Sequence, residues 1–174
     1  VMRQIANLID TLTSRELAKG KTVLGVGLAV AGLINKQTGI IEYSPVFDWK
    51  NVNVKAELRK YLSLPVFYDN VSRLTALGEL WYGIGKSHDN FISVNLGYGI
   101  GAGIIAGGKP FYGADGYAGE FGHMVLDSDS PMKGREGIAG TLEALSSGYG
   151  IAETAKMEVQ KDNSGMLSSK HLAQ

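Results

Sequence analysis

The apolar positions of this chain follow two spacings, one typical of helices and one typical of buried strands. At its start, Met2, Ile5, Leu8, Ile9 and Leu12 recur at intervals of three and four residues. This spacing predicts an amphipathic helix with one face on a core. Because no cap residue precedes Val1 and no strand leads into this helix, we expect the natural polypeptide to begin upstream.

Strands and further helices are predicted downstream of that helix. Val23–Ala31 is an apolar run rich in β-branched residues and predicts a buried strand, and Ile40–Tyr43 and Pro65–Tyr68 predict two more. Helical spacing returns over Val52–Leu62 and again from Leu74 to Trp81. This alternation indicates an α/β fold with a mainly parallel or mixed sheet.

Two polar residues follow the strand at Pro65–Tyr68. Asp69 and Asn70 lie where this strand ends and the next helix begins. Ligands of open α/β sheets bind beyond the carboxyl ends of the strands, so both residues are candidates for ligand contact. For Asp69 we favour the role of a helix cap.

The polar, glycine-bearing segment Gly83–Asn90 predicts a boundary between two lobes. We assign residues 1–90 to most of an N-terminal lobe and residues 91–174 to the start of a C-terminal lobe. The second part opens with a strand at Phe91–Asn95. It ends in one helix and the start of another over Ile151–Gln174, with a break at Asn163–Gly165.

Charge and cysteine content exclude several classes of protein. Lys plus Arg is 17 and Asp plus Glu is 17, so the balanced charge gives no sign of a nucleic-acid footprint in this segment. The chain has no cysteine, which excludes disulfides, thiolate zinc sites and a cysteine nucleophile, and is consistent with a cytoplasmic location. Its longest apolar run, Val23–Ile34, is far shorter than the roughly 20 residues that span a bilayer, so we predict no membrane partner.

Glycine is the one unusual component, at 24 residues, of which 15 lie between Gly97 and Gly150. From Gly97 to Gly103 every second residue is glycine, and in a strand this period removes the side chains from one face. A bare face with exposed N–H groups suits a phosphate. It equally suits a tightly packed hairpin without a ligand.

Familiar phosphate motifs are absent from the cluster. No register through Gly97–Gly108 places glycines at the offsets of a dinucleotide fingerprint. Gly103 and Gly108-Lys109 have P-loop spacing, but Pro110 stands where a metal-binding hydroxyl is required. The Rossmann and P-loop classes are therefore excluded.

A turn rich in glycine follows the cluster and ends in Glu120 and His123. An acid and an imidazole three residues apart offer carboxylate acceptors and a ring donor, which suit the hydroxyls of a sugar or polyol. A surface ion pair or a cap is the alternative interpretation of the same two residues.

Taken together, these motifs resemble the ROK family of repressors and sugar kinases. Its signature is matched by Leu96, Gly99-Ile100-Gly101-Ala102-Gly103-Ile104, Gly113, Gly119 and Gly122-His123. The resemblance implies the two-lobed, actin-like ATPase (ribonuclease H-like) fold. Only part of that fold is present here, since its first phosphate hairpin would precede Val1.

The resemblance also implies a sugar site between the lobes. Its sugar-binding residues would be Gly32, Asn70, Glu120, His123 and Glu143. Phe47 and Trp49 lie in the loop that usually flanks the sugar. The family's phosphate hairpin would be Gly99, Gly101 and Gly103, here as a vestige.

Two departures from the family's kinases affect catalysis. The kinases carry an aspartate, the general base, directly after the asparagine, and this position is Val71. A positioned base contributes about 10²–10⁴ in rate, so we predict no catalytic residue at this position. Tyr98 also replaces a threonine that is common in the kinase hairpin.

A third departure concerns metal. Many members of the family bind zinc with the turn histidine and three cysteines, whose positions here are Gly134, Glu136 and Thr141. Structural zinc almost always has four ligands, so we predict no zinc at His123 and no other cofactor. The loop Asp127–Ile138 is then held by packing, or is mobile.

These residues favour the sugar-sensing effector domain of a ROK-type transcriptional regulator, which binds a hexose or related sugar without phosphorylating it. DNA would be a partner only through a winged helix-turn-helix upstream of this chain, and a homo-oligomer is expected. The alternative is an active, glucokinase-like sugar kinase that uses ATP and Mg²⁺, with Asp69 or a water in place of the base. A third hypothesis is a scaffold that binds no small molecule.

Overall fold

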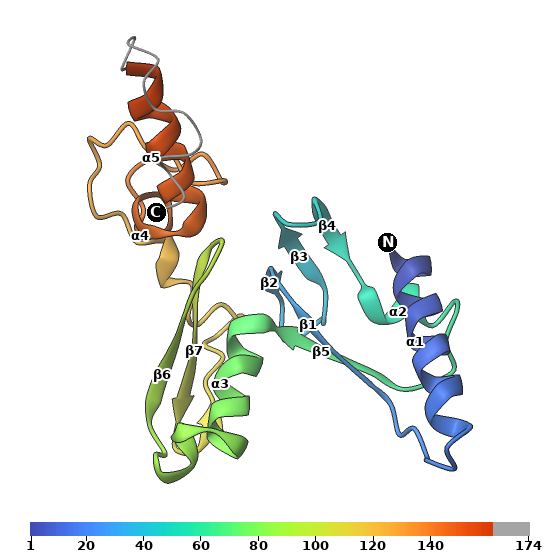
Figure 1. The fold of residues 1–174 in the computed structure, drawn as a ribbon. Coiled ribbons are helices and arrows are strands. Elements are labelled where there is room, and N and C mark those ends of the chain that lie inside the picture. The colour runs from blue at the N-terminus through green and yellow to red at the C-terminus, as the bar shows by residue number, and fades with distance from the viewer. Residues whose placement is uncertain (162–174) are drawn as a thin grey trace. The chain divides into compact units, whose positions relative to one another are not determined.

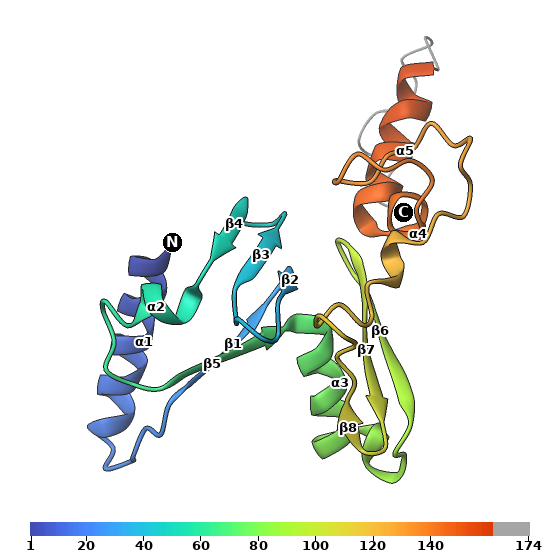
Figure 2. The ribbon, with the colours of Figure 1, turned by 180° about the vertical axis from the view of Figure 1, so that it is seen from behind.

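Two parallel strands, β1 (Val26–Val30) and β5 (Val66–Asn70), lie at the centre of the first part of the chain. Their register pairs Val26 with Val66 and Val30 with Asn70, so both strands end at the same edge. Both strands were predicted from their apolar runs. The computed structural model describes residues 1–161, and Figures 1 and 2 show this part of the chain from opposite sides.

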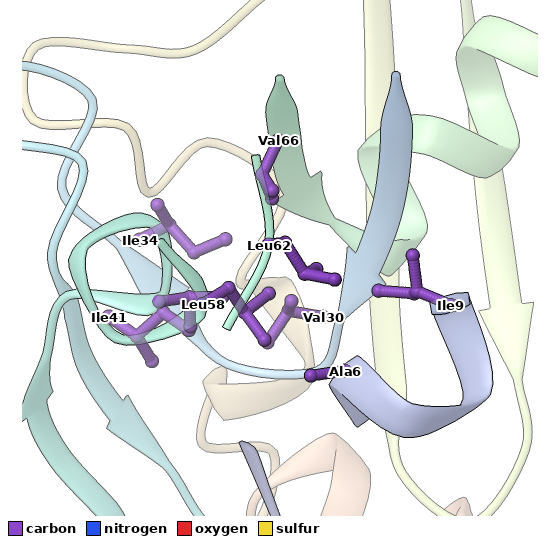
Figure 3. Close-up of a cluster of buried hydrophobic side chains, with 9 residues drawn as sticks. Ala6, Ile9, Val30, Ile34, Ile41, Leu58, Leu62 and Val66 are labelled. Atoms are coloured by element: carbon purple, nitrogen blue, oxygen red, sulfur yellow. The ribbon is translucent and has the colours of Figure 1, made fainter. Parts of the chain in front are cut away.

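Helices α1 (Met2–Leu17) and α2 (Val54–Leu58) lie side by side against these strands (Figure 1). The predicted N-terminal helix is confirmed, but Leu8 and Leu12 are 61% and 42% exposed. Ile9 of the predicted face is buried, and so is Ala6, which was not predicted (Figure 3). The buried core consists of apolar residues from both helices, from the segment after α2 and from four strands: Ala6, Ile9, Val30, Ile34, Ile41, Val54, Leu58, Leu62 and Val66.

An antiparallel sheet follows β1. It is formed by β2 (Leu33–Ile34), β3 (Ile41–Ser44) and β4 (Trp49–Val52). Only β3 was predicted, because β2 has two residues and β4 has no regular alternation of apolar and polar side chains. The helix predicted over Val52–Leu62 is shorter than expected and is capped by Asn53, whose side chain accepts a hydrogen bond from the Ala56 amide.

Helix α3 (Val71–Tyr82) begins directly at the end of β5. It ends at Gly83 as predicted, and the Gly83 amide donates to the Glu79 carbonyl. The 3₁₀ helix η1 (Ile84–Ser87) then packs back on α3.

The glycine cluster forms a hairpin of β6 (Phe91–Leu96) and β7 (Ile100–Ala106), extended by β8 (Lys109–Pro110). Helix α3 lies against β7, as both ribbon views show (Figures 1 and 2). A Cβ on Gly103 would lie 2.3 Å from the Ser72 carbonyl oxygen, so only glycine allows this contact.

The chain divides into two units. Unit 1 comprises residues 1–93 and 103–118, and unit 2 comprises residues 94–102 and the chain from Gly119 onward. The division therefore passes through the hairpin, whereas the lobe boundary at residue 90 stays a prediction. Unit 2 contains the 3₁₀ helix η2 (Phe121–His123), α4 (Leu142–Ser146) and α5 (Gly148–Lys161).

The C-terminal helix begins earlier than predicted. Helix α5 starts three residues before the predicted Ile151, and the break and second helix predicted after it lie outside the described residues. Within residues 1–161, no helix has both the length and the apolar character needed to cross a membrane.

Candidate functional site

Gly32 and Asn70 lie together at the carboxyl end of the parallel strands in unit 1. The Asn70 side-chain amide donates to the Gly32 carbonyl over 3.0 Å. Gly32 cannot be replaced without moving the backbone, because a Cβ there would lie 2.5 Å from the Tyr43 carbonyl oxygen. Ser44 fixes the same turn by donating to the Ala31 carbonyl over 2.5 Å. Two of the predicted sugar-binding residues are thus brought together.

Asn70 is also the N-cap of α3. Its Oδ1 accepts from the amides of Ser72 at 2.8 Å and Arg73 at 3.3 Å. The cap role predicted for Asp69 is therefore wrong, because the strand-to-helix turn brings the Asn70 oxygen under the free amides. After the bond to Gly32, the second hydrogen of the Asn70 amide group has no acceptor among residues 1–161 and can reach a ligand.

Asp69 is held by three donors instead. Its Oδ1 accepts from Arg73 Nη1 at 2.5 Å and from the Asn70 amide at 2.7 Å, and its Oδ2 accepts from the Tyr112 hydroxyl at 3.0 Å. Both carboxylate oxygens are therefore occupied. Burial, and after it the charge and hydrogen bond of Asp69, raises the pKa of the Tyr112 hydroxyl, which keeps this donor protonated.

The Arg73 side chain is only 4% exposed and joins three segments of unit 1. Besides Asp69 it donates to the Gly116 carbonyl over 2.6 Å, and its guanidinium lies 4.3 Å from the centre of the Tyr112 ring. Its Nε is buried and has no hydrogen-bond partner among residues 1–161. This arginine was not predicted as part of the site, although its i,i+4 spacing from Asp69 is a signal for pairing at a helix start.

Phe47 and Trp49 lie in the turn before β4 and at its start. Their rings stack with centroids 4.6 Å apart and an interplanar angle of 25°. Phe47 is 44% exposed, so the pair offers an aromatic surface within unit 1.

Unit 2 carries the acid and imidazole turn on the start of β7. A Cβ on Gly119 would lie 2.0 Å from the Ala102 carbonyl oxygen, and one on Gly122 would lie 2.2 Å from that of Ile100. Gly119 has φ +97°, a conformation that other residues rarely adopt. The two glycines therefore let the turn lie directly on the strand.

Glu120 and His123 face each other within this turn. His123 Nε2 lies 3.7 Å from Glu120 Oε2, and both side chains are about one third exposed, at 35% and 30%. The predicted pairing of these two groups on one side of a turn is therefore observed. Both keep surface on which hydroxyl groups can bind.

Glu143, in the first turn of α4, reaches the same strand. Its Oε2 accepts from the Ile100 amide over 2.7 Å. The Leu142 amide donates to the Met124 carbonyl, which ties α4 to the residue after His123. Unit 2 thus gathers Glu120, His123 and Glu143 around Ile100, while Gly32 and Asn70 belong to unit 1.

The glycine hairpin is closely packed at two of its glycines. A Cβ on Gly99 would lie 2.6 Å from Glu143 Oε2, and Gly103 is covered by α3. At the tip, the Gly97 and Tyr98 carbonyls accept from the first amides of α5, at 2.9 and 3.2 Å. These contacts account for the missing side chains at Gly99 and Gly103 without a ligand, and the phosphate-binding role of Gly99, Gly101 and Gly103 stays a prediction.

Tyr98, where the kinases often have threonine, packs on its own unit. Its ring lies 5.9 Å from that of Tyr149 in an edge-to-face contact, and the Arg135 guanidinium lies 5.1 Å from its centre. The tyrosine therefore has a packing role at the hairpin tip.

The positions of the family's zinc ligands lie near one another but carry no ligand set. A Cβ on Gly134 would lie 3.4 Å from both Glu136 Oε2 and Thr141 Oγ1. Thr141 uses this oxygen to cap α4 by accepting from the Ala144 amide. Within residues 1–161 no group of three or more His, Cys, Asp or Glu side chains could hold a metal ion. A tetrahedral zinc does not fit these residues.

The loop that zinc would fix is held by backbone bonds and one buried side chain. Bridges pair Val125 with Thr141 and Lys133 with Ala139. Met132 is 7% exposed, and its carbonyl accepts from the Gly140 amide over 2.8 Å. Of the two predicted states of this loop, the structure shows packing.

Comparison with known proteins identifies the family. The sequence profile of the ROK family matches residues 1–172. A glucokinase from Thermotoga maritima is 35% identical over 168 residues, which cover 96% of this chain and 51% of that protein. A xylose repressor from Caldicellulosiruptor bescii is 32% identical over 161 residues, which cover 92% of this chain and 40% of the repressor.

The solved structure of a ROK family glucokinase from Streptomyces griseus, in complex with glucose and AMPPNP, is similar to this chain with a TM-score of 0.76 and 30% identity. The match covers 93% of this chain and 51% of that one. The mixed α/β architecture is thus part of the actin-like ATPase fold, and the chain belongs to the ROK family. It spans about half the length of the glucokinases it matches. Both the fold class and the family resemblance are confirmed.

Proposed function

We propose that this chain is the sugar-sensing effector part of a ROK-type transcriptional regulator, and that it binds a hexose or related sugar without phosphorylating it. The observation that carries the proposal is the state of the two residues that flank Asn70. Val71 stands where the kinases have their base, and a valine side chain accepts no proton. Asp69, the nearest carboxylate along the chain, has both oxygens engaged by Arg73, Asn70 and Tyr112.

The occupied carboxylate weakens the kinase alternative. For Asp69 to act as base, it would have to leave a buried arginine without a counter-charge, and a broken buried pair costs about 3–5 kcal/mol. The substitution of the base and the engagement of its neighbour therefore favour binding without phosphoryl transfer.

The candidate sugar residues keep donors and acceptors for hydroxyl groups. Glu120 and His123 are held on β7 by two glycines, and Glu143 is oriented by the Ile100 amide through only one of its oxygens. Such preorganised groups suit a polyol. In this proposal Gly32 and Asn70 supply the contacts of the other unit.

Glu143 also disfavours the binding of a nucleotide phosphate at the glycine hairpin. Its carboxylate occupies the Ile100 amide in the glycine hairpin and would repel a phosphate there. In this proposal the regulator holds no nucleotide tightly. It also holds no zinc, because Gly134, Glu136 and Thr141 stand at the positions of the cysteine ligands.

The relatives are compatible with both the regulator hypothesis and the kinase hypothesis. A repressor and a glucokinase match nearly the whole chain at 32% and 35% identity. In the regulator, DNA binding would belong to a winged helix outside these residues, and a homo-oligomer stays a prediction. In the kinase alternative, ATP and Mg²⁺ would supply the phosphoryl group and its charge neutralisation.

Two measurements test the proposal. Calorimetry measures the binding of xylose, glucose and N-acetylhexosamines, and a coupled assay measures sugar-dependent ATP hydrolysis. We expect saturable binding of at least one sugar, a loss of tenfold or more in Glu120→Gln, and no turnover. Asp129→Asn removes an exposed carboxylate of the same unit and serves as the control. Turnover within tenfold of ordinary sugar kinases would establish the kinase, and no heat with any sugar would establish the scaffold.

A further inference from the structure

A pocket of about 410 Å³ lies in unit 1, between β5, the turn joining β2 to β3, and the start of α2. Its volume falls within the range of small-molecule sites, about 300–1,000 Å³. Neither Gly32 nor Asn70 lines it. The residues that do so and matter here are Lys36, Lys55, Tyr68, Asp69, Arg73 and Tyr112.

The lining carries excess positive charge. Lys36 and Lys55 take part in none of the ion pairs among the described residues, so neither ammonium group has a carboxylate within 4.0 Å. Asp69 is the one acid of the lining, and its charge is balanced by Arg73. Two uncompensated lysines therefore set the potential of the pocket.

The surroundings hold the ammonium group of Lys36 and the backbone of Lys55 near the pocket. The Lys36 ammonium lies 3.1 Å from the centre of the Tyr112 ring, and that ring is fixed by the hydrogen bond from its hydroxyl to Asp69. Lys55 is exposed, and its backbone at the start of α2 is held by Val54, which is 1% exposed and belongs to the core. The Tyr112 ring therefore positions the ammonium group of Lys36, and the core positions the backbone of Lys55.

Hydrogen bonds also hold the side of the pocket that is formed by β5 and the turn between β2 and β3. The Tyr68 hydroxyl donates to the Gly39 carbonyl and so joins β5 to the turn that carries Lys36. Burial raises the pKa of Tyr68, which keeps this donor protonated. Asn35 closes the turn by accepting from the amides of Gln37 and Thr38.

We propose that this pocket is a second small-molecule site, separate from the sugar residues, and that it binds the anionic group of a phosphorylated or carboxylated metabolite. Lysine ammonium groups are compact point charges with three donors each, which suit phosphate and carboxylate oxygens. Tyr112 and Tyr68 offer a polar and aromatic wall for the rest of the ligand. The site stands on unit 1 alone and does not depend on the proposed sugar function.

An NMR titration at low ionic strength tests the site. The chain is titrated with inorganic phosphate, glycerol 3-phosphate or malonate, and the chemical shifts of the pocket amides are followed. Phosphate-selective binding would identify a phosphate ester as the ligand class, and malonate-selective binding a carboxylate. We expect saturable shifts that weaken about tenfold with Lys36→Gln or Lys55→Gln, and further with both. Added salt should weaken binding as well.

Lys50→Gln is the matched control, because Lys50 is an exposed lysine of the same unit that does not line the pocket. It should bind the probes as the wild type does. Absence of saturable shifts with all three probes would overturn the proposal. So would unchanged affinity in the folded double variant, since the anion would then bind elsewhere, for example at the glycine hairpin. Sugar binding measured on the same variants reports independently on the function proposed above.

Discussion

Asp69 and Arg73 form a buried ion pair across the junction of β5 and α3, with Oδ1 and Nη1 2.5 Å apart. Asp69 is the next-to-last residue of β5 and Arg73 lies in the first turn of α3, so the pair ties the end of the strand to the start of the helix. The same arginine holds the Gly116 carbonyl, three residues before the chain enters unit 2 at Gly119.

Loss of this arginine should destabilise unit 1 strongly. Arg73→Met leaves Asp69 buried without its counter-charge, and we expect a loss of about 3 kcal/mol in the free energy of unfolding. Urea denaturation measures it, with the exposed Arg59→Met as a control that changes stability by less than about 0.5 kcal/mol. Adding Asp69→Asn to Arg73→Met should recover part of the loss. Additive losses in the double variant would show that the two residues do not interact.

The hairpin glycines should differ in their tolerance of a methyl group. Gly103→Ala places a Cβ 2.3 Å from the Ser72 carbonyl and 2.5 Å from Ala76 Cβ. We expect it to cost about 1–3 kcal/mol through overpacking. Gly97→Ala meets only the Gly99 carbonyl at 4.0 Å and should cost less than about 0.5 kcal/mol. Thermal or chemical unfolding of both variants checks this, and equal costs would contradict the packing interpretation.

Glu42 should titrate at a higher pH once its tyrosine partner is removed. Hydrogen bonds from Tyr117 and then from Asn35 lower the pKa of Glu42 below its ordinary 4.5. A lowered carboxyl pKa means that the contact stabilises the fold above pH 4.5, and that this contribution is lost as the pH falls through the lowered pKa. In Tyr117→Phe the pKa of Glu42 should rise towards 4.5, measured by NMR titration of the side-chain carboxyl.

Glu16 provides the internal reference for this titration. Hydrogen bonds from Lys19 and then from Lys21 lower its pKa, and neither bond involves Tyr117. The pKa of Glu16 should therefore be the same in both proteins. A Glu42 titration that is unchanged in the variant would show that the Tyr117 contact does not form in solution.

Zinc should not stabilise the protein as it stands. The positions of the three missing ligands are Gly134, Glu136 and Thr141, and none provides a thiolate. We expect the unfolding temperature to stay the same with added zinc or with a chelator. The variant with cysteines at these three positions should gain zinc-dependent stability, because the side-chain oxygens of Glu136 and Thr141 already lie 3.4 Å from a Cβ at Gly134. Stabilisation of the unaltered chain by zinc would contradict the interpretation of this site.

Local patterns predicted most of the framework. Apolar runs and helical spacing identified α1, β1, β5 and α3, and Gly83 marked the end of α3. These features depend on neighbours within a few residues, which is why a single sequence reveals them. Short elements such as β2, β8 and α4 were missed, because two to five residues carry too little periodicity.

The candidate site also has features that local spacing predicts and features that it does not. Glu120 and His123 could be paired from their spacing, since three residues place both on one turn. The engagement of both Asp69 oxygens could not be predicted, because one of the donors is Tyr112, 43 residues away along the chain. The pocket beside β5 likewise gathers residues from Ile34 to Tyr112, and no local pattern marks its lysines.

The sequence by itself determined the family and the strand-and-helix framework, and it places Val71 directly after Asn70, because each of these features is written in residue identity and short spacing. Only the tertiary structure decided that Asp69 is locked, that Asn70 caps α3, and that Gly99 and Gly103 are covered by protein groups. The physical reason is that hydrogen bonds, ion pairs and close contacts are satisfied by whichever groups the fold brings together, at whatever separation along the chain.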